Sequence, residues 1–266
     1  MKWKNHMEIA RAVAQALTLS PVRASILVDG SVQPDKEADK IIRVNREKTL
    51  YRARMAHHRA DRRFIMNLIW KARRDRLEGR DEDAVWCLGR ALHYVEDLCV
   101  ATAPFGMSHD SREEAIGRHR VNENAIMGGI RNSLNSPHFV WRCLLSLRSK
   151  RDPEDALFQA AMYAAAISAS VLGPVRPPRH LMHEIRGAKL AHWLIFLPLA
   201  SAFAAIFVYL AFTLQPFLVL AAPLLFLMTL LADRRYAYLR KEARWFGMEP
   251  REPATIISGL FRRSLR

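Results

Sequence analysis

A histidine and an aspartate are set four residues apart in an otherwise apolar stretch of the sequence, LGRALHYVEDLCV, residues 88–100. On a helix this spacing places the side chains of His93 and Asp97 on one face, about one turn apart, where both can bind the same metal ion. Such a pair alone is more often a surface pair, but an uncompensated histidine and acid inside an apolar helix are costly to bury. The stretch therefore predicts a metal site if other segments supply ligands.

Two further histidine–carboxylate pairs lie downstream. His109 and Glu113 repeat the same spacing, and His119 and Glu123 compete with them for the same role. Nitrogen and carboxylate oxygen without thiolate are the ligands of catalytic zinc sites, since structural zinc sites usually use cysteine. The three cysteines of the chain form no spacing motif.

More candidate ligands lie upstream. Asp35 follows a proline in a segment rich in turn formers, which predicts a loop. His57 and His58 are adjacent in a basic segment, and His6 lies near the start of the first helix. Each alone has an ordinary explanation as a turn aspartate, a solvated pair or a helix start. Their joint occurrence and their order along the chain favour a shared metal site.

The order of these motifs resembles the zinc-dependent phospholipase C family, whose superfamily also includes zinc-dependent single-strand nucleases. The segments that carry the resemblance are NHMEIA, GSVQPD, HH, LGRALHYVEDL and SHDSREE, and ALHYVEDL is the most specific of them. The resemblance covers residues 1–125 approximately. It implies an all-helical domain that holds up to three zinc ions and cleaves phosphodiesters.

By position, the resemblance implies that the first zinc has the most complete set of ligands: Asp35, His58 (or His57), His93 and Asp97. His109 and Glu113 would bind a second zinc, and His6 would bind a third that Asp97 bridges. Two departures affect these last two sites. Ala103 stands where the family has a histidine, and the chain has Trp3 where secreted members use the amino group of an N-terminal tryptophan.

Two uncharged apolar runs, residues 190–212 and 216–232, predict a transmembrane hairpin, because each approaches the length needed to cross about 30 Å of hydrocarbon. The chain carries 41 basic and 26 acidic residues, a net charge of +15, and basic residues flank the hairpin on both outer sides. These are Arg176, Arg179, Arg186 and Lys189 before it, and Arg234, Arg235, Arg240, Lys241 and Arg244 after it. The positive-inside rule then predicts that both termini are cytoplasmic. The charged start of the chain argues against a signal peptide.

The remaining sequence shows helical periodicity and no convincing strand alternation. Helices are expected near the start of the chain and over residues 21–28, 49–77, 82–100, 111–126, 137–147 and 153–172. The predicted fold class is all-α, a multi-helix soluble metal-binding domain followed by a two-helix transmembrane hairpin. The predicted divisions are the metal-binding domain over 1–173, a basic linker over 174–189, the hairpin over 190–232 and a basic cytoplasmic tail over 233–266.

The apolar runs predict an integral membrane protein, and the resemblance implies that it is a zinc-dependent phosphodiesterase of the phospholipase C type, which would hydrolyse phospholipid headgroups with metal-activated water. Asp35 would also act as the general base that orients this water. One alternative is a single-strand nuclease, which would need aromatic platforms near the metals, for which Trp86, Tyr94 and Phe105 are the candidates. The other is a membrane-bound scaffold with an incomplete metal site.

Overall fold

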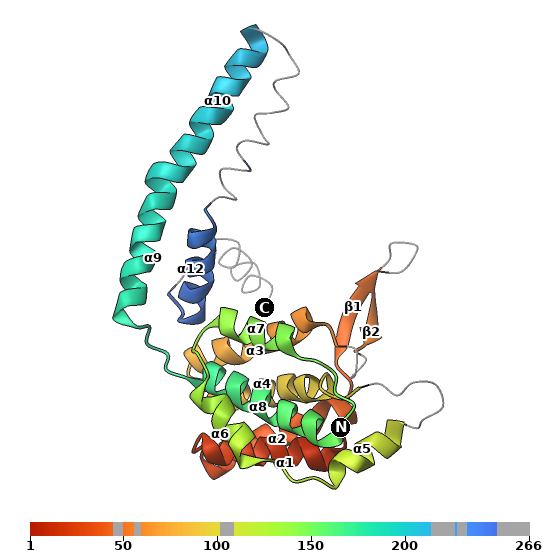
Figure 1. The fold of residues 1–266 in the computed structure, drawn as a ribbon. Helices are drawn as coiled ribbons and strands as arrows, with labels where there is room; N and C mark the ends of the chain where they lie inside the picture. The colour runs from red at the N-terminus through yellow and green to blue at the C-terminus, as the bar shows by residue number, and fades with distance from the viewer. Residues whose placement is uncertain (45–49, 56–59, 102–108, 214–226, 228–232, 249–266) are drawn as a thin grey trace, which may run out of the picture. The chain divides into compact units, whose positions relative to one another are not determined.

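A computed structural model describes residues 1–44, 50–55, 60–101, 109–213, 227 and 233–248 of the chain (Figure 1). The chain divides into two compact units, Met1–Val175 and Arg176–Arg266. We call the first the helical unit and the second the C-terminal unit. Apart from one β-hairpin in the helical unit, the described elements are helices, so the predicted helical class is confirmed.

The helical unit contains eight described α-helices and two strands. In chain order they are α1 (Trp3–Ala16), α2 (Pro21–Lys36), β1 (Lys40–Val44), β2 (Leu50–Arg54), α3 (Arg62–Leu77), α4 (Asp81–Asp97), α5 (His109–Gly117), α6 (Glu123–Arg131), α7 (Pro137–Ser146) and α8 (Pro153–Leu172). Helix α4 is central, because it packs against α2, α3 and α8 (Figure 1). Most of its side chains are buried.

Polar residues fix where several of these helices begin. In α2, α3, α6, α7 and α8 the residue before the helix is an N-cap, whose side-chain oxygen accepts a hydrogen bond from a backbone N–H of the first turn. These caps are Ser20, Asp61, Asn122, Ser136 and Asp152. A proline occupies the first turn of α2, α7 and α8, where its missing N–H costs nothing. These sequence signals explain why the predicted and observed boundaries of α7 and α8 nearly coincide.

The prediction of a loop after residue 28 is wrong, because α2 continues through Gly30 and Pro34 to Lys36. Gly30 lies against α4, where a Cβ atom would be 2.6 Å from the carbonyl oxygen of Trp86. On the facing helix, a Cβ on Gly89 would be 2.6 Å from the carbonyl oxygen of Leu27. The glycines thus permit a close helix crossing rather than a break. As a result Asp35 is held on a helix and not on a loop.

Two other helix predictions are also wrong. The helix expected over residues 49–77 begins only at Arg62, and β2 precedes it, paired antiparallel with β1. The β-branched residues of KIIRV favour the first strand, and pairing recruits LYRAR as the second. The helix expected over residues 111–126 is instead two, α5 and α6, because the chain leaves the helix after Gly117.

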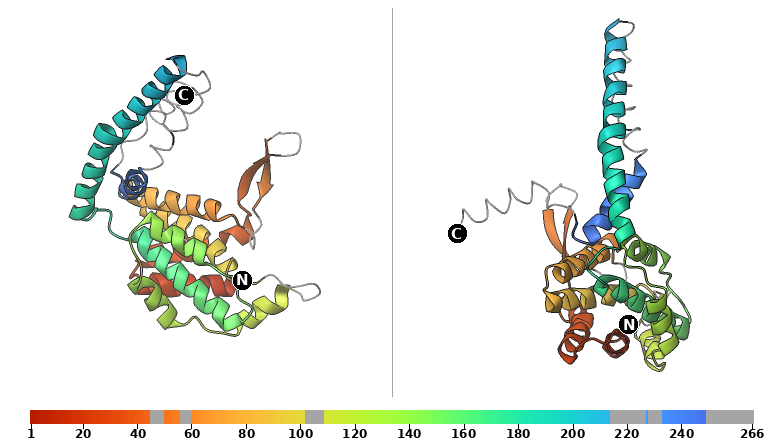
Figure 2. Two further views of the ribbon diagram at one scale, coloured as in Figure 1. Left: turned by 45° about the horizontal axis from the view of Figure 1, so that its top comes forward. Right: turned by 90° about the vertical axis from the view of Figure 1, so that its left-hand side faces the viewer.

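The C-terminal unit contains α9 (Arg179–Ala191), a π-helical turn η2 (His192–Phe196), α10 (Leu197–Thr213) and α12 (Arg234–Trp245). Helix α9 runs through η2 into α10 as one long helix, so the segment predicted as a linker over 174–189 is helical from Arg179 (Figure 2). The second apolar run, residues 216–232, falls almost entirely outside the described residues, and so does the tail after residue 248.

Among the described residues, two helices are long and apolar enough to cross a membrane. One is Pro153–Leu172, which is α8, and most of it is buried inside the helical unit. The other is Arg179–Leu210, of which very little is buried in the structure. By length and composition both helices could span a membrane. Because α8 is a buried core helix, Arg179–Leu210 is the better candidate for a membrane-spanning helix.

Candidate metal centre

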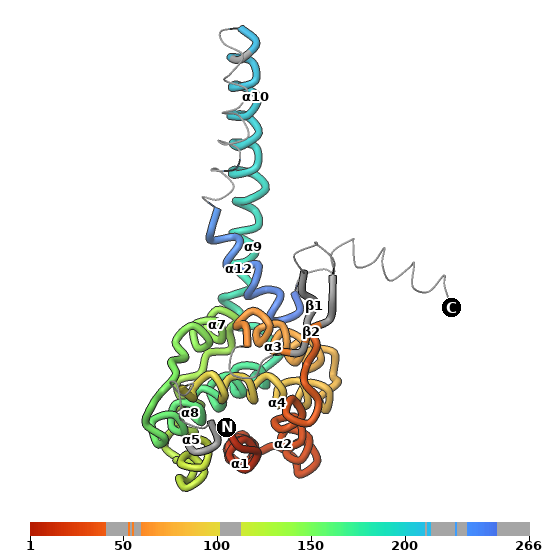
Figure 3. The backbone as a smooth tube through the Cα atoms, turned by 90° about the vertical axis from the view of Figure 1, so that its right-hand side faces the viewer, coloured from red at the N-terminus to blue at the C-terminus, as the bar shows by residue number. Residues whose placement is uncertain are grey.

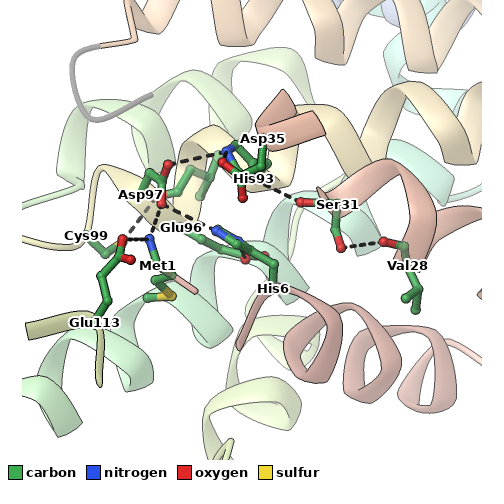
Figure 4. A network of polar contacts seen from close by, with 11 residues as sticks. Met1, His6, Val28, Ser31, Asp35, His93, Glu96, Asp97, Cys99 and Glu113 are labelled. Atoms are coloured by element: carbon green, nitrogen blue, oxygen red, sulfur yellow. Dashed lines mark hydrogen bonds and ion pairs between the residues drawn. The ribbon is translucent and has the colours of Figure 1, made fainter. Parts of the chain in front are cut away.

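Two buried histidines face each other at the centre of the helical unit (Figure 4). His6 comes from α1 and His93 from α4, and their ring centroids are 4.3 Å apart. Nδ1 of His6 lies 2.5 Å from Oε2 of Glu96, and Nδ1 of His93 lies 2.9 Å from the backbone carbonyl oxygen of Ser31. Because these partners accept hydrogen bonds, both Nδ1 atoms donate. In each ring the remaining nitrogen, Nε2, is therefore turned towards the centre.

Carboxylates surround these Nε2 atoms. Nε2 of His93 lies 3.5 Å from Oδ1 of Asp35 and 3.4 Å from Oδ2 of Asp97, while Nε2 of His6 lies 3.4 Å from Oδ1 of Asp97. Asp97 therefore contacts both histidines. Ligand atoms of His6, Asp35 and His93 all lie within 4.8 Å of one another, so one ion could bind all three.

The Nε2 atom of His6 is buried, and its nearest polar contact is a long one, 3.4 Å to Oδ1 of Asp97, with no hydrogen bond of good geometry. Buried polar atoms nearly always have a partner, so this one needs an explanation. A histidine whose Nδ1 donates to a fixed acceptor and whose Nε2 faces carboxylates is arranged like a metal ligand. The residues present therefore fit a bound cation.

The amino group of Met1 extends this cluster towards α5. Its nitrogen lies 2.5 Å from Oδ1 of Asp97 and 3.0 Å from Oε1 of Glu113. Figure 3 shows the N-terminus beside α1, α5 and α8, and Met1 is buried there. The positively charged amino group thus lies between the carboxylates of Asp97 and Glu113, a position that favours a cation.

The pKa values of Glu96 and Asp97, two neighbouring acids of α4, shift in opposite directions. Burial would raise the pKa of Asp97, but interaction with His6, the Met1 amino group and His93 holds it well below its usual range. Burial also raises the pKa of Glu96, and His6 only partly offsets the effect. For His6, burial alone would lower the pKa, but Asp97 and Glu96 raise it to about 9. The surroundings of Asp97 therefore favour its charged form, whereas those of Glu96 favour its neutral form.

The structure brings together five of the seven predicted ligands: His6, Asp35, His93, Asp97 and Glu113. The other two are not decided. His58, like its alternative His57, lies outside the described residues, as does Ala103, and His109 begins α5 but only its backbone is described.

The structure bears on two details of the predicted assignment. His6 was expected at a different zinc from Asp35 and His93, and the ligand atoms of all three lie within 4.8 Å of one another. The competing pair His119–Glu123 does not share a helix face, because the exposed His119 follows the end of α5 and Glu123 begins α6. Glu113 is the downstream carboxylate that reaches the cluster.

Sequence reasoning missed Glu96 and Ser31. Glu96 adjoins Asp97 in an apolar helix, and that second buried acid was a usable signal, but nothing links it by spacing to His6. Ser31 contributes only a backbone carbonyl, which leaves no trace in the sequence.

No protein-family model, curated protein or solved structure matches the chain. Its function therefore has to be inferred from the arrangement of its own residues.

Proposed function

We propose that the helical unit is a zinc-dependent phosphodiester hydrolase of the phospholipase C type. One observation carries the proposal: the buried His6 and His93 both turn Nε2 towards the carboxylate of Asp97, while their Nδ1 atoms are fixed by other partners. Imidazole and carboxylate ligands suit zinc. The resemblance of ALHYVEDL to the zinc-dependent phospholipase C family supports a phosphodiester as the substrate.

The aspartates of the centre differ in exposure, and this suggests different roles. The side chain of Asp35 is 23% exposed, whereas that of Asp97 is 2% exposed. Asp35 can therefore reach solvent and orient an attacking water as a general base. Asp97 is enclosed between the histidines and would hold the cation. When bound, zinc would supply a nucleophile at neutral pH and offset negative charge on the phosphoryl oxygens.

A membrane substrate is favoured by the C-terminal unit. The exposed apolar helix begins beyond Lys189, and Asp233 lies 2.5 Å from Nδ1 of His192. The described residues on the two sides of the predicted hairpin thus meet at the same end of α10. Both basic flanks would then face the same side of a membrane, in agreement with cytoplasmic termini. An enzyme anchored in this way has phospholipid headgroups as its nearest phosphodiesters.

A nuclease is less well supported. Of its candidate base-stacking side chains, Tyr94 is fully buried and donates its hydroxyl to Oδ2 of Asp39 at 2.8 Å. It cannot stack on an incoming base. Phe105 lies outside the described residues, which leaves the half-buried Trp86.

The proposal is tested with the full-length protein, purified in neutral detergent and loaded with zinc. We expect hydrolysis of a water-soluble phosphodiester and of phospholipid in mixed micelles, loss of both activities on chelation and recovery with added zinc. Faster cleavage of a single-stranded oligonucleotide would establish the nuclease instead. Protein that neither retains zinc nor cleaves any of the three substrates would be the scaffold.

Glu96 is expected to strengthen zinc binding without being a ligand, because it fixes the ring of His6. Glu96→Ala should lower zinc affinity by about 10- to 100-fold, the usual effect of losing an outer partner of a metal ligand. Glu96→Gln keeps an acceptor for Nδ1 and should lose less. Competition with a chromophoric chelator measures both.

Asp75→Asn serves as the control for Glu96. Asp75 is another buried carboxylate, but it pairs with Lys71 at 2.9 Å on the same helix, α3, and with Arg80. Its loss should lower the melting temperature and leave zinc affinity unchanged. Wild-type zinc affinity in Glu96→Ala would show that the contact with His6 has no such role.

A further inference from the structure

The cationic side chains of the C-terminal unit gather on two helices. Exposed lysines and arginines on α9 and α12 form what we call the basic collar: Arg179, Arg186, Lys189, Arg234, Arg235, Arg240, Lys241 and Arg244. Acids do not balance them. On these two helices the acidic residues are Glu184, which lies 3.7 Å from Arg235, and the buried Glu242. The collar therefore presents a strong excess of positive charge.

A partly buried polar contact holds the two helices of the collar together. Oδ2 of Asp233 lies 2.5 Å from Nδ1 of His192, and Oδ1 of Asp233 accepts a hydrogen bond from the backbone N–H of Tyr236 in α12 at 3.3 Å. The His192 ring stacks on Tyr236, with 4.3 Å between centroids and 19° between planes. Residues 41 positions apart in the sequence are thus joined, and α12 packs against α9. The fold concentrates cations that the sequence separates.

The collar is followed directly by side chains suited to a bilayer. Leu190, Trp193, Leu194 and Ile195 are 55–65% exposed, and the apolar α10 continues from them. Trp193 lies at this border, and Tyr238 of α12 is 49% exposed. Tryptophan and tyrosine concentrate at the level of lipid headgroups, next to lysine and arginine. If α10 enters hydrocarbon, the end of the basic collar next to it, with Lys189 and Arg234, lies at the depth of the phosphates.

We propose that the basic collar binds anionic phospholipid headgroups and so gives the protein a preference for anionic membrane surfaces. The inference rests on the membrane anchoring proposed above and is independent of the hydrolase. A nucleic acid would also be attracted by this charge, but the adjoining exposed apolar helix favours a lipid surface. Each cation near such a surface contributes about 1 kcal/mol, which is roughly a fivefold change in affinity.

The test titrates tail-labelled phosphatidylglycerol or phosphatidylcholine into the full-length protein in neutral detergent. We expect phosphatidylglycerol to bind at least about tenfold more tightly, since several cations would act together. High salt should reduce the preference, because the screening length falls to about 3 Å at 1 M. Equal binding of the two lipids, or displacement of phosphatidylglycerol by an oligonucleotide that binds more tightly, would overturn the proposal.

Two variants with the same change in net charge locate the binding. In the first, four exposed collar residues are replaced by glutamine: Arg186, Lys189, Arg234 and Lys241. In the second, four exposed arginines of the helical unit are replaced: Arg11, Arg63, Arg74 and Arg131. Only the first should lose the preference for phosphatidylglycerol. An equal loss in both would mean that diffuse net charge, and not the collar, binds the lipid.

The experiments distinguish a failure of the proposed membrane anchoring from a failure of the proposed lipid binding by the collar. A full-length protein that stays soluble and monomeric without detergent would contradict the anchoring, and with it the position of the collar at a bilayer. A protein that needs detergent but binds both lipids equally would contradict the collar alone. Hydrolytic activity decides neither question.

Discussion

Asp97→Asn is expected to lose zinc binding and phosphodiester hydrolysis together. Asp97 contacts His6 and His93 through different carboxylate oxygens and also pairs with the Met1 amino group, so it is the shared acid of the centre. Asparagine keeps the shape and removes the charge. Zinc affinity should fall by more than the roughly 10- to 100-fold that the loss of an outer partner costs.

The same substitution should lower stability without abolishing the fold. In the absence of zinc, a buried amino group and His6 would lose their charged partner, and breaking a buried ion pair costs about 3–5 kcal/mol. Circular dichroism should therefore show nearly unchanged helical content at low temperature and a lower melting temperature. Zinc stoichiometry and hydrolysis of a soluble phosphodiester are measured on the same protein.

His119→Ala is the control for Asp97→Asn. His119 is exposed and follows the end of α5, so its removal should change neither zinc content nor activity. Full activity in Asp97→Asn would show that the centre is assigned wrongly. A large loss in His119→Ala would show that the downstream ligands are not those we assign.

Helices that carry their own start signals could be predicted from the sequence. Helix α8 begins at a proline after the cap Asp152, and α7 begins at a proline after the cap Ser136, and both were placed to within a residue or so. The contact between His93 and Asp97 was also predictable, because a spacing of four residues places two side chains on the same face of one helix. In each case local physics decides the outcome.

What could not be predicted depends on contacts between distant segments. Gly30 and Pro34 signal a break locally, but packing against α4 keeps α2 helical through both. The contact between Glu96 and His6 joins residues 90 positions apart, and no periodicity encodes it. The grouping of His6 with Asp35 likewise depends on how α1 and α2 meet α4. The sequence thus supplied the chemistry of the ligands but not the way they are grouped.

Gly89→Ala is expected to destabilise the helical unit and also weaken zinc binding, because Gly89 sets the distance between α2 and α4. Its added Cβ would lie 2.6 Å from the carbonyl oxygen of Leu27 and 2.9 Å from the backbone nitrogen of Ser31. These are backbone atoms, so α2 itself has to move. Overpacking of this kind costs about 1–3 kcal/mol.

Movement of α2 should reach the metal centre directly. This helix carries Asp35, whose Oδ1 lies 3.5 Å from Nε2 of His93, and Ser31, whose carbonyl oxygen fixes Nδ1 of the same ring. Displacing α2 from α4 separates both groups from His93. We expect zinc affinity, measured by chelator competition, to fall about as much as when an outer partner is removed, roughly 10- to 100-fold.

Two glycines of α6 separate damage to the fold from damage to the site. A Cβ on Gly129 would lie 2.2 Å from the carbonyl oxygen of Met162 in α8, so Gly129→Ala should lower the melting temperature at least as much as Gly89→Ala. Its zinc affinity should stay at the wild-type value, because none of the ligands lies on α6. The neighbouring Gly128 has nothing within 4 Å of an added Cβ, so Gly128→Ala should stabilise the helix by about 0.5–1 kcal/mol. If Gly89→Ala loses no more zinc affinity than Gly129→Ala, the close crossing of α2 and α4 does not position the metal ligands.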